Sequence, residues 1–208
     1  MIITEIKKDK KHLMRISFRN GEEILLDTDT CTENRLIKGL DLDQETVAEL
    51  SFDSEYKRAK SRALWYLDRM DYTEKNLYTK LLRAGFDKKA SAKVLARLCE
   101  LGVVDDRRYA ERFAERCVES NISKRETMQK MLQKGVPYDL AKEILSDIET
   151  DEDAQIKALI ERKYSYKLSR EDGVQKVYAA LVRKGFSYGA VSKALKDYLN
   201  DIEICEEY

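Results

Sequence analysis

Apolar residues recur at helical spacing in three stretches of this chain, each fifty residues after the last. Leu77, Tyr78, Leu81 and Leu82 occupy positions i, i+1, i+4 and i+5, which mark one face of a helix. The second and third stretches place Thr127, Met128, Met131 and Leu132, and then Val177, Tyr178, Leu181 and Val182, at the same positions. The stretches end in KLLRAGF at 80–86, KMLQKGV at 130–136 and ALVRKGF at 180–186. The pattern predicts an internal repeat.

A glycine and then an apolar residue follow each of these predicted helices: Gly85 and Phe86, Gly135 and Val136, Gly185 and Phe186. Glycine just past a helix takes the left-handed conformation, which costs a residue with a Cβ roughly 1–2 kcal/mol. The apolar residue packs back on the last helical turn. Asp87 and Ser187 are expected to cap a second helix that starts at once, and Pro137 fits a helix start. We therefore interpret the six residues as structural turns.

The first part of the chain has the pattern of β-structure. Met14, Ile16 and Phe18 alternate with polar residues, Asn20-Gly21 follows, and Ile24 and Leu26 resume the alternation. This pattern is typical of a β-hairpin, and Ile2, Ile3 and Ile6 are candidates for a third strand. Residues 29–52 are expected to form one or two short helices, and residues 55–70 a long one.

The rest of the chain has helical patterns, so each repeat is expected to contain three helices. Residues 150–153 place acids at a helix start, where the helix dipole favours them, and residues 164–169 are expected to be a polar, aromatic loop. The predicted division is residues 1–52 for the hairpin with short helices, 53–102, 103–149 and 150–200 for the three repeats, and 201–208 for an acidic tail.

Composition narrows the class of protein. The 208 residues include 39 Lys+Arg and 39 Asp+Glu, yet residues 51–100 hold 12 basic against 7 acidic side chains and residues 151–200 hold 10 against 7. No apolar run suits a membrane span or a signal peptide, so a cytoplasmic protein is expected. The four cysteines and the single histidine, His12, favour reduced thiols over a metal site or disulfides. With no nucleophile–base pair and no phosphate-binding glycine loop, neither enzyme activity nor a cofactor is expected.

One further motif suggests a family. It opens the central repeat and consists of Asp105, Asp106, Tyr109, Ala110 and Phe113, with Arg116 following. Together with the helix containing Ala63-Leu64-Trp65-Tyr66-Leu67 and the glycine turns, it resembles the RecX family of bacterial recombination regulators over about residues 57–200. Val136-Pro137 departs from the Phe-Asp and Phe-Ser of the other two turns.

The resemblance implies a mostly α fold, an elongated and curved tandem array of three three-helix repeats with a small N-terminal β-hairpin extension. It also implies a protein that binds the RecA recombinase and its filament on single-stranded DNA; a monomer is expected, although the sequence does not give the oligomeric state. Such a protein modulates filament growth, ATP hydrolysis and co-protease activity, most often by inhibition, in recombination, DNA repair and the SOS response. Weak direct DNA binding is a further expectation.

Basic residues are the candidates for contact with RecA or with DNA phosphates. They are Lys57, Arg58, Lys60, Arg62, Lys88, Lys89, Lys93, Lys163, Lys167, Arg170, Lys176, Arg183, Lys184, Lys193 and Lys196. A solvated helix exterior accounts for them equally well. Tyr164 and Tyr166 are either base-stacking residues or part of an ordinary loop, the latter being favoured.

Three further alternatives stay open at this point. Asp105-Asp106 suits a helix start better than a metal pair. Tyr109 and Phe113 suit a core better than a partner-binding patch. A stand-alone helical DNA-binding protein, or a scaffold for another partner, remains the alternative to a recombinase regulator, although the balanced net charge disfavours a dedicated DNA binder.

Overall fold

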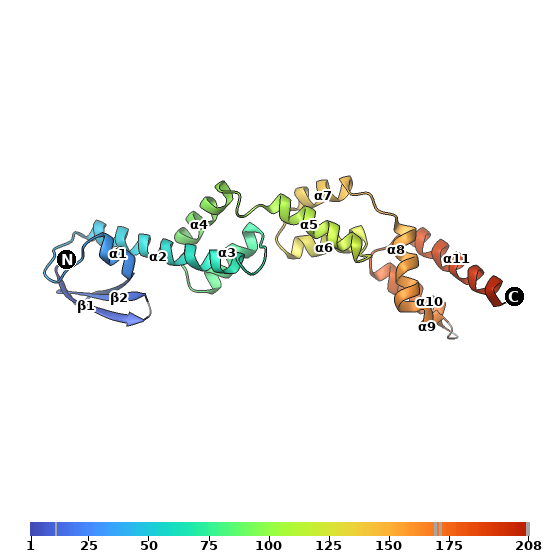
Figure 1. Cartoon of the computed structure of the whole chain (residues 1–208), viewed down its shortest axis with the longest axis horizontal. Coiled ribbons are helices and arrows are strands. Elements are labelled where there is room, and N and C mark those ends of the chain that lie inside the picture. Colours follow the sequence, from blue (N-terminus) through green and yellow to red (C-terminus); the bar gives the residue numbers. More distant parts are fainter. Residues whose placement is uncertain (11, 169, 171, 207–208) are drawn as a thin grey trace. The chain divides into compact units, whose positions relative to one another are not determined.

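The computed structural model describes residues 1–10, 12–168, 170 and 172–206, and side chains as far as residue 200. The chain is mostly helical, with one small sheet near the N-terminus (Figure 1). It divides into two compact units, Met1–Asp105 and Asp106–Tyr208, and each is described by itself.

The first unit begins with a three-stranded antiparallel sheet in the order β1-β2-β3. The strands are β1 (Ile3–Lys10), β2 (Leu13–Phe18) and β3 (Glu23–Asp27). Ile16 pairs with Ile6 on one side and with Ile24 on the other, and Gly21 in the turn has φ 87°. The predicted hairpin and third strand are therefore confirmed.

Helix α1 (Thr28–Glu33) follows the sheet, and α2 (Gln44–Leu67) is the longest helix described. Of the one or two short helices expected at residues 29–52, α1 is observed. A second one is not, because the helix expected at 55–70 already begins at Gln44. Val47 and Leu50 of α2 pack on the buried face of the sheet, so the helix keeps an apolar stripe on that side. One helix thus serves both the sheet and the first repeat and crosses position 52/53, and the division into domains stays a prediction.

The first repeat consists of α2, α3 (Glu74–Arg83) and α4 (Lys88–Glu100). Its core is formed by residues of all three helices, including Ala59, Leu77 and Leu98, each at most 1% exposed. Thr73 caps α3 and Asp87 caps α4, each accepting a hydrogen bond from a backbone N–H of the first turn, and the cap at Asp87 is the one predicted above.

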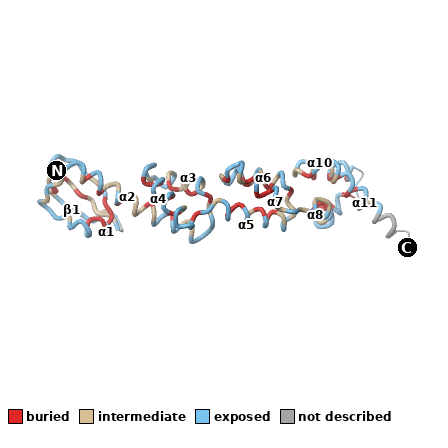
Figure 2. Tube along the Cα trace, turned by 90° about the horizontal axis from the view of Figure 1, so that it is seen from above, coloured by how far each residue is buried: buried red, intermediate tan, exposed pale blue. Residues whose placement is uncertain are grey.

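The second unit holds the other two repeats. The second repeat comprises α5 (Asp106–Glu119), α6 (Lys124–Gln133) and α7 (Tyr138–Asp147). The third comprises α8 (Glu152–Leu159), a π-helical turn (Ile160–Tyr164), α9 (Ser165–Leu168), α10 (Gly173–Arg183) and α11 (Tyr188–Glu206). Buried positions recur along the helices of both units (Figure 2), so each repeat has a local core.

The three glycine turns have the same hydrogen bonds. In the first, the Gly85 N–H donates to the Leu82 carbonyl (3.0 Å) and the Phe86 N–H to the Leu81 carbonyl (3.2 Å), which defines a Schellman motif. The equivalent long bonds measure 3.1 Å from Val136 and 3.4 Å from Phe186. The glycine φ angles are 90°, 86° and 91°. The structural reading of the turns is confirmed, and Val136-Pro137 keeps the same geometry.

The loop expected at residues 164–169 was wrong for the part that the structure describes, because residues 164–168 are helical. Ile156, Ile160, Tyr164 and Leu168 are all buried and lie four residues apart. In a regular α-helix that spacing drifts by about 40° per step, because four residues turn about 400°. A π-helical turn, which is wider, reduces the drift and keeps the four side chains in one core.

The structure describes three of the four cysteines, but it does not describe the side chains of the predicted acidic tail. Cys31 and Cys117 are free, and burial raises the pKa of both thiols. Cys205 and the acidic tail at 201–208 lie outside the described side chains. Within the described residues, no helix has the length and apolar character needed to cross a bilayer.

Candidate binding surfaces

The motif that opens the central repeat has mainly a packing role. Tyr109 and Ala110 are 8% and 0% exposed, and Phe113 packs against the same core. The Tyr109 and Phe113 rings are stacked with centroids 6.1 Å apart. Asp106 lies in the first turn of α5, with Asp105 directly before it, and Arg116 is exposed in the last turn. Among the described residues, no group of three or more His, Cys, Asp or Glu could hold a metal ion.

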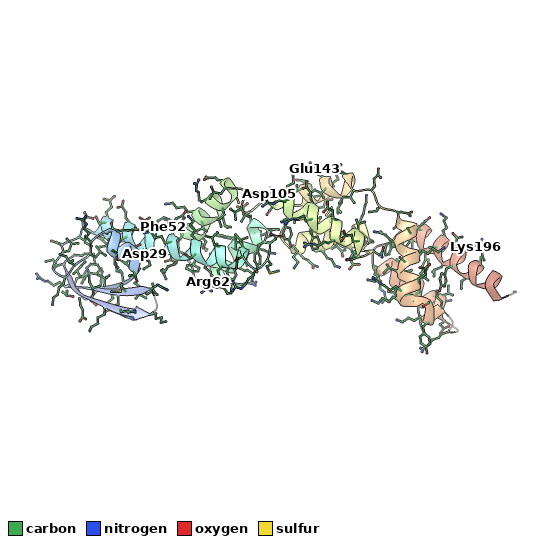
Figure 3. All side chains as sticks on the ribbon, viewed as in Figure 1. Asp29, Phe52, Arg62, Asp105, Glu143 and Lys196 are labelled. Atoms are coloured by element: carbon green, nitrogen blue, oxygen red, sulfur yellow. The ribbon has the colours of Figure 1, made fainter. Side chains whose placement is uncertain are left out.

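A groove of about 740 Å³, here called the α2 groove, lies in the first unit between α2 and the sheet. On its α2 side, Lys57, Ser61 and Trp65 form one row of residues spaced four apart, and Arg58 and Arg62 form a second. Both rows lie on one face of the helix. Its other side is formed by the β1–β2 turn and the start of α1, which include His12 and Asp29. Figure 3 labels Arg62 and Asp29 on these two elements.

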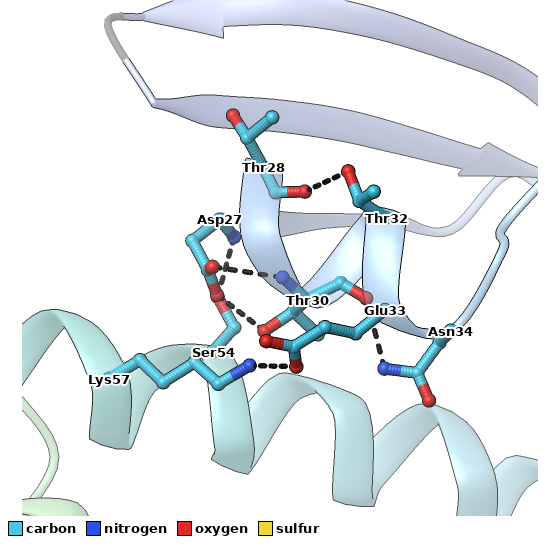
Figure 4. A network of polar contacts seen from close by, with 8 residues as sticks. All are labelled: Asp27, Thr28, Thr30, Thr32, Glu33, Asn34, Ser54 and Lys57. Carbon is cyan, nitrogen blue, oxygen red and sulfur yellow. Dashed lines mark hydrogen bonds and ion pairs between the residues drawn. The ribbon is translucent and has the colours of Figure 1, made fainter.

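A buried aspartate holds the sheet against α2 and so fixes one wall of this groove (Figure 4). Asp27 accepts hydrogen bonds from the Thr30 N–H (3.0 Å) and the Thr30 hydroxyl (2.6 Å), and its own N–H donates to Ser54 Oγ of α2 (2.7 Å). Burial alone raises the pKa of Asp27, but these hydrogen bonds and the charge of Lys57 outweigh it, so the pKa lies below its ordinary value. Lys57 also forms an ion pair with Glu33, which raises the lysine pKa.

Arginine and tryptophan form an exposed cluster at one end of the groove. The Arg62 and Arg69 guanidinium carbons lie 5.4 Å and 3.5 Å from the centre of the Trp65 ring, which is 46% exposed. Arg58 lies 3.7 Å from Glu55, and its Nε atom is buried with no partner among the described residues. Cations flanking an accessible aromatic ring suit an anionic partner that also has a flat face, such as single-stranded nucleic acid.

The third repeat has a smaller cluster around Tyr166, which is 74% exposed. The Arg170 guanidinium lies 5.0 Å from the Tyr166 ring centre and donates a hydrogen bond to its hydroxyl (3.2 Å). Lys163 and Lys167 are exposed nearby in sequence. Tyr164 cannot stack on a base because it is only 5% exposed, which excludes half of the predicted tyrosine pair.

The other candidate cations differ in what they contact: some form ion pairs, one lies over aromatic rings, and the rest form no ion pair in the described part of the chain. Lys176 lies 3.6 Å from Asp172, Lys184 lies 3.8 Å from Glu126, and Lys193 pairs with Asp153. Lys93 lies over the rings of Phe52 and Tyr56, at 5.0 Å and 5.2 Å. The remaining candidates form no ion pair with a carboxylate in the described part of the chain: Lys60, Lys88, Lys89, Arg183 and Lys196. Figure 3 labels Lys196 on α11.

Sequence reasoning missed Trp65 and Arg69 as surface residues. Trp65 stands in the helix predicted at residues 55–70, with an arginine three positions before it and another four positions after it. On a helix, both spacings place the cations beside the ring. That spacing was the signal available in the sequence.

The fold and these surfaces define a class: a helical repeat protein with exposed clusters of cationic and aromatic side chains on its repeats. Comparison with known proteins agrees with this class. Residues 59–98 match the model of the first three-helix domain of RecX, and residues 151–195 match that of the third.

Curated relatives over nearly the whole chain carry the same family name. The chain is 25% identical to the regulatory protein RecX of Clostridium tetani, over 96% of this chain and 94% of the relative. It is 29% identical to that of Streptococcus mutans, over 98% and 78%. A crystal structure of a regulatory protein RecX is similar in fold, with a TM-score of 0.66 at 23% identity, covering 94% of this chain and 98% of that one. The chain belongs to the RecX family of regulatory proteins.

Proposed function

We propose that this protein binds RecA and its filament on single-stranded DNA, and that it inhibits filament growth, ATP hydrolysis and co-protease activity in recombination, repair and SOS control. Membership of the RecX regulatory family is the observation that carries the proposal. The protein acts without a cofactor, as a monomer, in the cytoplasm where the DNA lies.

The binding surfaces support this proposal physically. The α2 groove and the Tyr166 cluster lie in different units, so one chain offers more than one contact to a repetitive partner such as a filament. Contacts that are individually weak then add through multivalent binding. Cations of both surfaces suit phosphates or carboxylates, and Trp65 suits a base or another flat group.

ATP hydrolysis by the RecA of the same organism on single-stranded DNA provides the test. We expect the rate to fall when this protein is added well below one molecule per recombinase, as it does when filament ends are blocked. A fall only near equal amounts indicates binding along the filament or capture of free RecA. An unchanged rate together with no RecA binding contradicts the proposal.

The Arg–Trp cluster favours one second candidate, direct binding of single-stranded DNA without a recombinase. Trp65 is the only tryptophan, so its fluorescence reports on this surface alone. Quenching by oligothymidylate, weakened by Arg62→Gln and by added salt, supports direct binding. Lys75→Gln removes the same charge from an exposed position on α3 outside the groove and serves as the matched control.

A further inference from the structure

A second cavity, of about 510 Å³, lies within the second unit between its two repeats. It is formed by the start of α6, the start of α8, and the turn from α10 into α11. Six of its lining residues matter to its chemistry: Lys124, Arg125, Glu152, Gln155, Phe186 and Tyr188. The sequence patterns single out none of them as a binding residue, and Phe186 is predicted only as a structural turn residue. We call it the inter-repeat cavity.

Gln155 is the unusual residue of this cavity. Its side chain is 6% exposed, and its amide nitrogen Nε2 has no hydrogen-bond partner among the described residues. Buried polar groups are nearly always hydrogen-bonded, because leaving a buried donor unpaired forfeits its hydration without replacement. The nitrogen is itself covered, so it reaches the cavity only when the amide group turns about its last side-chain bond, a rotation with a broad energy minimum. An acceptor that arrives with a ligand would then satisfy this donor.

The charges around Gln155 favour an acceptor with negative charge. Arg125 lines the cavity, its Cβ and Cγ lie against Gly185, and in the described part of the chain its guanidinium has no carboxylate partner. Lys124 donates to the Ile148 carbonyl (2.6 Å) and remains exposed. The one acid in the wall that matters, Glu152, is already bound by the N–H (2.7 Å) and hydroxyl (2.9 Å) of Ser187.

The N-termini of two helices add to the positive charge around the cavity. The first turns of α6, which has 10 residues, and of α11, which has 19, both border the cavity. Helix N-termini carry partial positive charge and favour anions. The buried amide, the two cations and the two helix starts favour an anion. Glu149, Asp151 and Asp153 lie beside Glu152 and oppose it, although Asp151 already accepts from the Ala154 N–H (3.0 Å) and Asp153 pairs with Lys193.

The geometry points to a receptor for an acidic side chain of a protein partner. One oxygen of a Glu or Asp carboxylate accepts from Gln155 Nε2 and the other pairs with Arg125, while the side-chain methylenes lie against Val182, Phe186 and Tyr188. A protein carboxylate suits this site better than a nucleic-acid phosphate. The donor is buried among apolar walls with a glutamate beside it, whereas phosphate backbones are bound mainly by exposed cations.

This inference rests on the proposed function for the identity of the partner, the recombinase, but not for the chemistry of the site. The first experiment therefore uses a capped peptide containing one glutamate and the full-length, ¹⁵N-labelled protein. We expect the side-chain amide signal of Gln155, assigned by its loss in Gln155→Leu, to shift saturably with the peptide and not with its glutamine analogue. No shift with either peptide overturns the carboxylate receptor, whatever RecA does.

The second experiment measures recombinase binding by the variants. Arg125→Gln and Gln155→Leu are each expected to weaken binding about tenfold, the effect of losing one charge-assisted hydrogen bond, with direct affinity for single-stranded DNA unchanged. Lys142→Gln on α7, an exposed lysine outside the cavity, is the matched control and is expected to bind as the wild type does. A loss of DNA affinity with unchanged RecA affinity overturns the inference in favour of a phosphate site.

A stability measurement separates a binding role for Gln155 from a structural one. Gln155→Leu removes an unpaired buried donor at similar volume, so its melting temperature is expected to equal or exceed that of the wild type. Weaker binding in a protein that is not destabilised supports a receptor. A lower melting temperature with unchanged binding assigns Gln155 a structural role and overturns the inference. If wild-type protein binds the glutamate peptide but not RecA, the proposed function fails while the receptor stands.

Discussion

Two equivalent glycines in the repeat turns offer a matched pair of substitutions, Gly85→Ala and Gly185→Ala. Both have φ close to 90° and the same Schellman hydrogen bonds. Their surroundings differ. A Cβ at Gly85 meets nothing within 4 Å, whereas a Cβ at Gly185 comes within 2.8 Å of Ser123 Oγ and 2.9 Å of Arg125 Cβ.

The expected costs follow from these contacts. Gly85→Ala incurs only the left-handed backbone penalty, about 1–2 kcal/mol. Gly185→Ala incurs the same penalty plus about 1–3 kcal/mol for overpacking. It also disturbs Ser123, which caps α6 by accepting from the Glu126 N–H (3.1 Å) and donates to the Lys184 carbonyl (2.5 Å), a link worth about 1 kcal/mol. We therefore expect a total of about 3–6 kcal/mol at Gly185.

Hydrogen exchange resolved along the chain separates the two effects. Gly85→Ala is expected to raise exchange in the first repeat only. Gly185→Ala is expected to raise it in α6 and in the third repeat together, because the clash lies between them. Urea unfolding followed by circular dichroism gives the free energies. Equal losses for the two variants, or faster exchange in the third repeat alone, would refute the reasoning from the contacts at Gly185.

Two other substitutions test the caps. The pKa of Asp27 is lowered in the folded protein, so its stabilising effect is complete above the ordinary pKa of 3.8 and is lost as pH falls through the lower folded pKa. Asp27→Asn should therefore cost about 1 kcal/mol at neutral pH and make the stability of the first unit less dependent on pH in acid. An unchanged acid unfolding profile contradicts this. Asn121 ends α5 at φ 55° with the Ile122 N–H bonded to the Cys117 carbonyl (2.9 Å), so Asn121→Gly should stabilise the second unit by a few tenths of a kcal/mol up to about 1 in urea titrations, with Gly85→Ala as the opposite-sign comparison.

Much of the fold could be predicted because its signals are local. The glycine turns, the caps at Thr73 and Asp87, and the hairpin at Asn20-Gly21 each depend on residues within a few positions of one another. The repeat period made these signals stronger, since the same pattern recurred three times. The family resemblance then added the fold class, which the comparisons confirm.

The errors arose where packing overrode local pattern. Helix α2 begins as early as Gln44 because Val47 and Leu50 pack against the sheet. This contact joins residues far apart in the sequence, so the local pattern does not reveal it. The segment 164–168 looks polar, yet Tyr164 and Leu168 are buried because a π-helical turn brings them round to the core. Both errors concern the extent of helical structure, which packing against neighbouring elements determined.

The sequence by itself determined most of the helices, the turns and the candidate cations of this protein, because spacing along the chain decides which side chains share one helix face. Only the tertiary structure decided which cations are already paired, as Lys193 is with Asp153, and which flank an exposed ring, as Arg62 does. It alone placed Gln155 and Arg125 in one cavity. Their positions lie thirty residues apart in sequence, and the packing of one repeat on the next brings them together.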